Sequence, residues 1–154
     1  MNPSSESLQY RPAVLADVPQ LCELLSQLFA QESDFSPDTN RQTLGLEMIL
    51  GDPAVGRLFC AVDGESVVGM VSILFTVSTA EGGRAAWLED MVVRPDRRGL
   101  GIGDRLLQTA ISGAKEAGCT RVTLLTDATN TPAQRFYARA GFARSQMIPL
   151  RLKL

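Results

Sequence analysis

Histidine is absent from the 154-residue sequence, and its absence removes whole classes of chemistry. A Ser-His-Asp or Cys-His nucleophile system needs an imidazole base, so both systems are excluded. Zinc sites that rest on imidazole ligands are excluded as well. Any acid–base step must therefore use Asp, Glu, Tyr, Cys, Lys, a chain terminus or water.

Cysteine is scarce too. The three cysteines, Cys22, Cys60 and Cys119, lie far apart, and no CxxC pair occurs. This spacing predicts neither a zinc cluster nor a disulfide framework. We expect three small thiols that are buried or half-buried, and no bound metal.

A strong charge of one sign and a long apolar run are also missing. The formal net charge is −2 at pH 7, whereas dedicated nucleic-acid-binding proteins usually carry a strong basic excess. No apolar run approaches the roughly 20 residues that span a bilayer, and the opening MNPSSESLQY lacks the pattern of a signal peptide. We therefore expect a cytoplasmic protein with no nucleic-acid or membrane partner.

What is present is an ordinary globular mixture, 45% hydrophobic and 21% charged, of the length of one domain. We expect a single domain over residues 1–154, with a flexible N-terminus at 1–7. Hydrophobic periodicity predicts strands at 8–14, 57–62, 67–77, 85–93, 121–127 and 142–154. It predicts helices at 18–29, 36–52, 104–118 and 132–140. The order β-α-α-β-β-β-α-β-α-β predicts a mixed α/β sheet, antiparallel in its early strands and parallel in its late ones, flanked by helices.

Turn and cap signals support these boundaries. The expected N-caps are Asp17, Ser36, and either Asn130 or Thr131. Pro37 suits the first helical position after Ser36, and Gly141 suits the C′ position of the last helix.

The segment RPDRRGLGIG, residues 94–103, sets three glycines at alternate positions beside Arg97 and Arg98. It follows an apolar strand and opens an amphipathic helix, where free N–H groups and the helix dipole favour an anion. We expect it to hold a phosphate or pyrophosphate, with the arginines adding charge-assisted hydrogen bonds. It is not a P-loop, which needs GxxxxGK[ST], nor a dinucleotide loop, whose third glycine would fall on Asp104 or Leu106.

Two motifs resemble those of the GNAT superfamily of N-acetyltransferases. VVRPDRRGLGIGDRLL resembles its acetyl-CoA pyrophosphate loop, with the pattern [RQ]xxGx[GA] matched by Arg98, Gly101 and Gly103. NTPAQRFYARAGF, residues 130–142, resembles the later segment in which an asparagine precedes a helix and FYxxxGF. The expected element order is also similar to the GNAT fold, including a parallel pair that splays at strands four and five.

The resemblance implies a binding role for each matching position. Backbone N–H groups would bind the pyrophosphate of the co-substrate acetyl-CoA at Arg98, Gly99, Leu100, Gly101, Ile102 and Gly103. The pantetheine arm would pair, where the two strands splay, with the backbone of Met91, Val92 and Val93. The Asn130 side chain can hydrogen-bond the arm, and Tyr137 lies near the thioester sulfur. Phe136 belongs either to this cofactor side or to core packing.

Direct attack of an amine on the thioester fits a chain without histidine. Tyr137 carries its proton at pH 7 and is the candidate acid for the leaving thiolate, the alternative being a tyrosine buried by its ring. Glu89 and Asp90 are the candidate bases. Adjacent strand residues face opposite sides, so only one of them is expected to face the cleft. The LED run resembles that of polyamine and amino-sugar acetyltransferases, which favours Glu89; a solvated or ion-paired carboxylate is the alternative.

The sequence gives a less specific prediction for the amine that accepts the acetyl group than for the acetyl-CoA side. The acidic residues of the first two helices and their connection are Glu32, Asp34, Asp38 and Glu47. They suit a cationic small-molecule amine, or they are a solvated helix surface. The alternatives to a small-molecule N-acetyltransferase are a protein lysine or N-terminal acetyltransferase and an acyl-CoA-binding module without turnover. The apolar segment MIPLRLKL can pair across an interface, and the resemblance also implies a homodimer.

Overall fold

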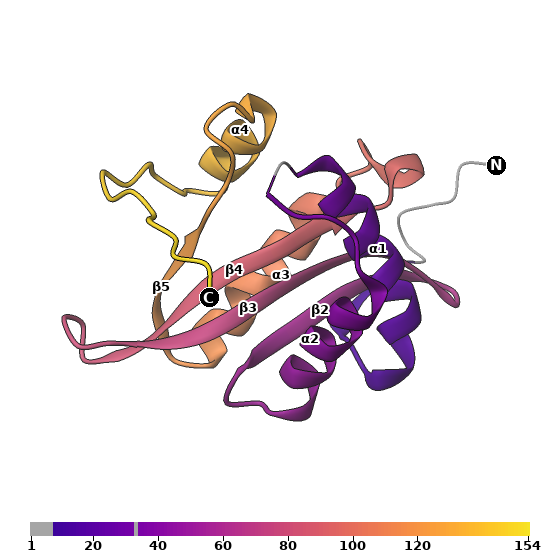
Figure 1. The fold of residues 1–154 in the computed structure, drawn as a ribbon, viewed down its shortest axis with the longest axis horizontal. Helices are drawn as coiled ribbons and strands as arrows, with labels where there is room; N and C mark the ends of the chain where they lie inside the picture. The colour runs from indigo at the N-terminus through magenta and orange to yellow at the C-terminus, as the bar shows by residue number, and fades with distance from the viewer. Residues whose placement is uncertain (1–7, 33) are drawn as a thin grey trace. The chain divides into compact units, whose positions relative to one another are not determined.

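A five-stranded sheet, whose strand order follows the chain, organises the first part of the structure (Figure 1). This computed structural model describes residues 8–32 and 34–154, so the flexible terminus expected at 1–7 lies outside the described residues. The strands are β1 (Leu8–Pro12), β2 (Gly56–Asp63), β3 (Ser66–Ser78), β4 (Gly83–Val93) and β5 (Cys119–Leu124). Neighbours are antiparallel from β1 to β4, and β4 and β5 are parallel. The predicted mixed α/β class is confirmed.

The chain divides into two compact units, Met1–Leu124 and Leu125–Leu154. The helices of the first unit are α1 (Val18–Gln31), α2 (Thr39–Gly51) and α3 (Ile102–Glu116), with the short 3₁₀ turns η2 (Leu15–Asp17) and η3 (Pro95–Arg97). The second unit contains α4 (Thr131–Arg139). Each predicted helix is therefore confirmed, with boundaries shifted by a few residues.

The two faces of the sheet are covered by different helices. On one face, Leu58, Cys60 and Met70 pack with residues of α1 and α2 in a buried apolar cluster. On the other face, α3 lies so close that a Cβ on Gly113 would stand 2.5 Å from the Phe59 ring. Alternate residues of β2 thus point to opposite faces, as strand geometry requires.

The start of α2 differs from the prediction. The helix begins at Thr39 with Asp38 as its N-cap, not with Ser36 and Pro37. The Asp38 carboxylate accepts a hydrogen bond from the Arg41 N–H at 3.1 Å, and the Gln42 side chain accepts one from the Asp38 N–H at 2.7 Å. These reciprocal bonds satisfy two backbone donors at the helix start, which Ser36 lies too early in the chain to do.

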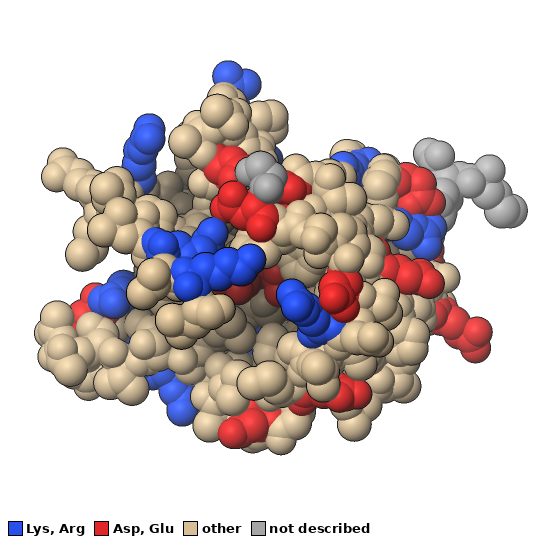
Figure 2. All heavy atoms as spheres, in the orientation of Figure 1, with Lys and Arg blue, Asp and Glu red and all other residues tan. Residues whose placement is uncertain are grey.

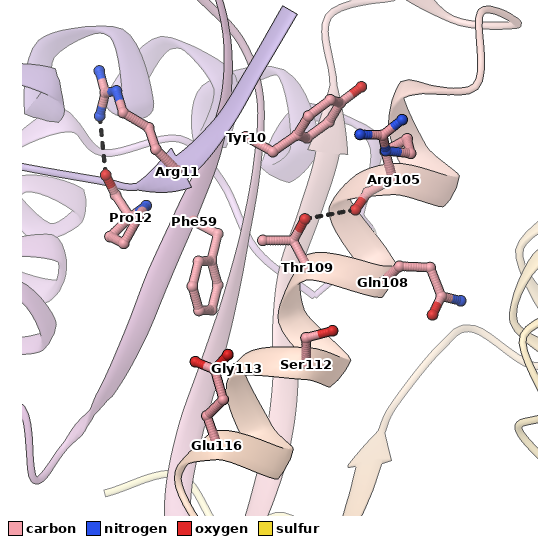
Figure 3. Close-up of a pocket in the computed structure, with 10 residues that line it drawn as sticks. All are labelled: Tyr10, Arg11, Pro12, Phe59, Arg105, Gln108, Thr109, Ser112, Gly113 and Glu116. Carbon is pink, nitrogen blue, oxygen red and sulfur yellow. Dashed lines mark hydrogen bonds between the residues drawn. The ribbon is translucent and has the colours of Figure 1, made fainter.

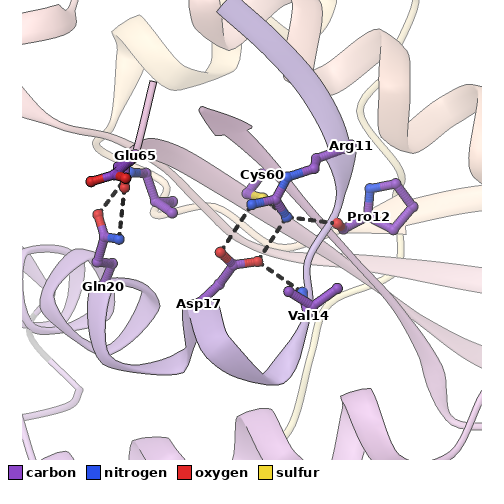
Figure 4. A network of polar contacts seen from close by, with 8 residues as sticks. Arg11, Pro12, Val14, Asp17, Gln20, Cys60 and Glu65 are labelled. Carbon is purple, nitrogen blue, oxygen red and sulfur yellow. Dashed lines mark hydrogen bonds and ion pairs between the residues drawn. The ribbon is translucent and has the colours of Figure 1, made fainter. Parts of the chain in front are cut away.

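Asp17 occupies the N-cap position of α1 but does not cap it. Its buried carboxylate instead accepts hydrogen bonds from both terminal nitrogens of Arg11, at 2.8 and 3.0 Å, and from the Val14 N–H at 2.8 Å (Figure 4). Arg11 also donates to the Cys60 sulfur at 3.4 Å. The Arg11 guanidinium lowers the pKa of Asp17, while burial raises the pKa of the Cys60 thiol to about 11. The network ties β1, η2 and β2 together.

We expect Asp17→Ala to lower the free energy of unfolding by about 1–3 kcal/mol at pH 7, because it removes the carboxylate that pairs with Arg11 and accepts from the Val14 N–H. The folded-state pKa of Asp17 lies below its unfolded value, so this contribution is present above the unfolded pKa and disappears as the pH falls through the folded one. Urea unfolding at several pH values measures it. Asp96→Ala, which removes an exposed ion pair with Arg94, is the control and should cost much less. An equal loss in both variants contradicts the assignment.

The strand predicted at 142–154 is not formed, since no strand follows α4. The apolar side chains of that segment are almost fully exposed: Met147, Ile148, Leu150, Leu152 and Leu154. Pro149 has no N–H to give to a ladder, and an alternating pattern makes a strand only where a neighbouring strand accepts its hydrogen bonds.

Candidate active site

The glycine stretch forms an open turn into a helix. β4 ends at Val93, η3 follows, and Gly101 stands at the N-cap of α3 with φ +79°. Gly99 has φ +76°, and a Cβ on either glycine would meet nothing within 4 Å. As a glycine, the N-cap residue has no side chain with which to bond the amides of the first turn. A strand, an open glycine turn and a helix start follow one another here, which is the arrangement that suits an anion.

The arginines beside the glycines have other contacts than expected. The Arg97 guanidinium forms an ion pair with Asp63, at the turn between β2 and β3. This ion pair links the loop to the end of β2. Arg98 is exposed, and its Nε donates to the Val93 carbonyl at 3.1 Å, which holds its side chain against the end of β4.

The parallel pair separates before β4 ends. The ladder between β4 and β5 stops at Leu88 and Leu124, whereas β4 continues to Val93 alongside β3. Within the described ranges, the other edge of residues 89–93 therefore faces no strand. The side chains of Val92 and Ile102 are buried in the core, so only their backbone groups can serve a ligand. Met91 and Val93 are half-buried.

A bulge in β4 lies at the same point. Ser72 faces Glu89 and Met70 faces Val92, so Asp90 and Met91 together oppose one residue of β3. Asp90 has φ +53°, unlike every other described non-glycine residue. A bulge interrupts the regular alternation of a strand, and Asp90 is half-buried here. That only one of Glu89 and Asp90 faces the cleft stays a prediction.

Asp90 lies in an acidic surrounding. Burial raises its pKa to about 6, and the nearby negative charges of Glu89 and Glu32 add to the rise. Glu89 itself is exposed. Of the other acidic residues proposed to face an acceptor, Asp38 caps α2, while Asp34 and Glu47 are exposed. The structure therefore brings Glu32 to the strand carboxylates, but not Asp38.

The second unit holds the remaining motif residues. The Asn130 oxygen accepts a hydrogen bond from the Ala133 N–H at 3.1 Å, so Asn130 is the N-cap of α4. The Tyr137 ring packs edge-on against Phe136 at 5.0 Å and Phe142 at 5.7 Å between ring centroids. Burial raises the pKa of Tyr137 to about 12, so its hydroxyl keeps its proton at neutral pH. Phe136 is half-buried and packs on this tyrosine.

A surface groove between β1 and α3 contains none of the predicted site residues (Figure 3). The Phe59 ring and Gly113 lie in it, and the Arg105 guanidinium stacks over the Tyr10 ring at 5.0 Å.

On the face drawn in Figure 2, Lys and Arg side chains are interspersed with Asp and Glu side chains. Within the described ranges, no helix combines the length and apolarity that a bilayer crossing requires.

Comparison with known proteins identifies relatives over much of the chain. The chain is 30% identical over 137 residues to the aminoalkylphosphonate N-acetyltransferase of Salmonella typhimurium, covering 89% of this chain and 86% of that protein. It is 33% identical over 101 residues to the glucosamine 6-phosphate N-acetyltransferase of Trypanosoma brucei brucei, covering 65% and 66%.

A solved structure is similar over nearly the full length. The integron cassette protein from the Cole Harbour salt marsh metagenome superposes with a TM-score of 0.82 at 31% identity, covering 95% of this chain and 90% of that one. The model of the acetyltransferase (GNAT) family matches residues 18–142, which include the glycine loop, the bulge and α4. The chain belongs to the acetyltransferase (GNAT) family.

Proposed function

We propose that the chain transfers the acetyl group of acetyl-CoA to the amine of a small molecule. The main support is the junction at the end of β4, where the strand runs past its ladder with β5 and leads into α3, whose N-cap residue is a glycine. An extended arm with an anionic end fits such a junction. Backbone groups of 91–93 can pair with the arm, and the amides of 98–103 can bind the pyrophosphate.

Residues of the chain supply the chemistry of direct transfer. A strand carboxylate, Asp90 or Glu89, accepts the proton that the amine loses. A backbone N–H near Val92 stabilises the oxyanion that develops on the acetyl carbonyl. Tyr137 gives its proton to the leaving thiolate. A C–N bond forms and the C–S bond breaks, with no covalent enzyme intermediate. An ammonium nitrogen loses two protons on becoming an amide: the carboxylate passes one to water, and the second replaces the proton that Tyr137 gives to the thiolate.

Asp90 is the base that the geometry favours over Glu89, because it is the partly buried carboxylate at the bulge. A base works only when ionised, so kcat/KM should rise with pH through a midpoint near 6 and stay level above it. Asp90→Asn should lower kcat/KM by about 100-fold and abolish this rise. Initial rates between pH 5 and 8 measure both.

Glu89→Gln is the matched control for Asp90→Asn. If Asp90 is the base, Glu89→Gln keeps most of the activity and moves the midpoint to lower pH, because one negative charge beside Asp90 is lost. If the Gln variant loses activity and the Asn variant does not, the proton goes to Glu89 as the sequence motif favours.

Charge guides the choice of acceptors. Glu32, Glu89 and Asp90 together favour a positively charged ammonium group at the reacting end. The relatives named above act on amines that carry a phosphonate or phosphate group, which supports a small acceptor with an anionic group at its other end. A polycationic amine is the other substrate that the acidic surrounding supports.

A thiol-release assay with acetyl-CoA tests the proposal over a panel of amines. The panel comprises aminoalkylphosphonates, glucosamine 6-phosphate, polyamines, aminoglycosides, and peptides with a free lysine or N-terminal amine. We expect release with a small amine that exceeds release with every peptide. Release with peptides alone indicates a protein acetyltransferase. No release above the rate without amine, in protein that binds acetyl-CoA, indicates a module without turnover.

We also propose a homodimer, because the segment from Met147 to Leu154 exposes five large apolar side chains. Light scattering should give twice the chain mass, and removal of residues 147–154 should give the mass of one chain. A single-chain mass for the full-length protein contradicts the dimer. The cytoplasmic location stays a prediction from the sequence.

A further inference from the structure

Ser72 is a polar residue in an otherwise apolar face of the sheet. It lies in β3, its side chain is fully buried, and its strand neighbours on the same face include Met70 and Leu58. A buried hydroxyl needs a hydrogen-bond partner. The Ser72 hydroxyl donates to the backbone carbonyl of Glu89 at 3.0 Å.

The position of this bond along β4 gives it a specific consequence. Glu89 directly follows Leu88, where the ladder to β5 stops, and directly precedes Asp90 with its positive φ. A bulge disrupts the regular strand ladder, and here it lies beyond the point where the ladder to β5 stops, in a segment that pairs with β3. The Ser72 hydroxyl thus supplies a hydrogen-bond donor where β4 departs from regular pairing.

We propose that Ser72 is a positioning residue, whose buried hydroxyl fixes the bulge of β4 and thereby the place of the Asp90 carboxylate. The inference rests on the proposed function, since it gives Asp90 a role in the reaction. Ser72 acts through the backbone of Glu89 and does not itself touch the substrates. The charged groups beside Asp90 are Glu89 on its own strand and Glu32 at the end of α1.

Ser78 provides a matched control on the same strand. It is also buried, and its hydroxyl accepts hydrogen bonds from the Glu81 N–H and from Arg121, both at 3.2 Å. It lies at the far end of β3, where the ladder to β4 is regular. Ser72→Ala and Ser78→Ala therefore each remove one buried hydroxyl, but only the first removes the bond at the bulge.

The test is a carboxyl ¹³C NMR titration of Asp90 in the full chain, with Asp90→Asn to assign the signal. We expect a pKa near 6 in the wild type and in Ser78→Ala. In Ser72→Ala it should fall by about one unit toward the ordinary aspartate value of about 3.9, because a loosened bulge lets water reach the carboxylate. If Ser72→Ala does not fold, Ser72→Cys replaces it, since the thiol has a similar shape and is only a weak donor.

The kinetic readout is separate. The midpoint of kcat/KM against pH should move with the Asp90 pKa in the Ser72 variant and stay in place in Ser78→Ala. An Asp90 pKa that is unchanged in the Ser72 variant, or that falls equally in both variants, overturns the proposal and leaves Ser72 as a satisfied core hydroxyl. If the titration behaves as expected but no amine is acetylated, the proposed function fails while the role of Ser72 in shaping the bulge stands.

Discussion

Gly101→Val is expected to weaken the binding of acetyl-CoA by roughly 5- to 150-fold. Gly101 has φ +79° at the start of α3, a conformation that a β-branched residue adopts only under strain. Strain of this kind costs about 1–3 kcal/mol. If acetyl-CoA binds to this turn, that cost corresponds to the roughly 5- to 150-fold loss of affinity. Because a Cβ at this position meets no atom within 4 Å, the effect comes from the backbone and not from a clash. Calorimetric titration with acetyl-CoA measures it.

Gly82→Val is the control for this change. Gly82 has φ +67° in the turn between β3 and β4, and a Cβ there also meets nothing within 4 Å. Both variants should show a similar loss in the free energy of unfolding in urea. Only the change at Gly101 should weaken the binding of acetyl-CoA. Unaltered affinity in Gly101→Val means that the pyrophosphate binds elsewhere.

Tyr137→Phe is expected to lower kcat by about 100-fold while leaving the Kd for acetyl-CoA unchanged. The phenylalanine keeps the ring that packs between Phe136 and Phe142 and removes only the hydroxyl. Without that hydroxyl, the thiolate must leave without a positioned proton donor. Steady-state rates with the best amine of the panel, and titration with acetyl-CoA, give the two constants.

The chain has only one other tyrosine, which makes Tyr10→Phe a natural control. Tyr10 lies in β1 beneath the Arg105 guanidinium, in the groove that contains no predicted site residue. Its variant should turn over at the wild-type rate. Equal rates in Tyr137→Phe and the wild type remove Tyr137 from the mechanism and leave it as a ring-packing residue.

Local sequence signals predicted the elements that depend on local physics. The alternate glycines demand a backbone that other residues avoid, and Gly99 and Gly101 both have positive φ. The hairpin around Gly64 and the helix after the glycine stretch follow from turn chemistry and periodicity in the same way. For the same reason the turn from β4 into α3 could be placed from the sequence.

The features that were missed depend on partners distant in the sequence. The bulge at Asp90 arises from the register between β3 and β4, and nothing in the run LED indicates a bulge. Arg97 lies next to the glycine stretch, but its partner Asp63 is 34 residues away. β5 ends at Leu124, before the predicted 127, because the ladder to β4 has already stopped. The last predicted strand has the right alternation but no neighbouring strand to pair with.

Thermal melting of the wild-type protein with acetyl-CoA, CoA, NAD, ATP or no ligand tests the proposed acetyl-CoA site directly. A ligand that binds only the folded state at 100 times its Kd adds about 2.7 kcal/mol of stability, which for a chain of this size raises Tm by about 5–11 °C. We expect such a rise with acetyl-CoA and with CoA, and none with NAD or ATP. A rise with NAD or ATP alone, or no rise with acetyl-CoA, would contradict the assignment of the glycine loop and of every site residue that follows from it.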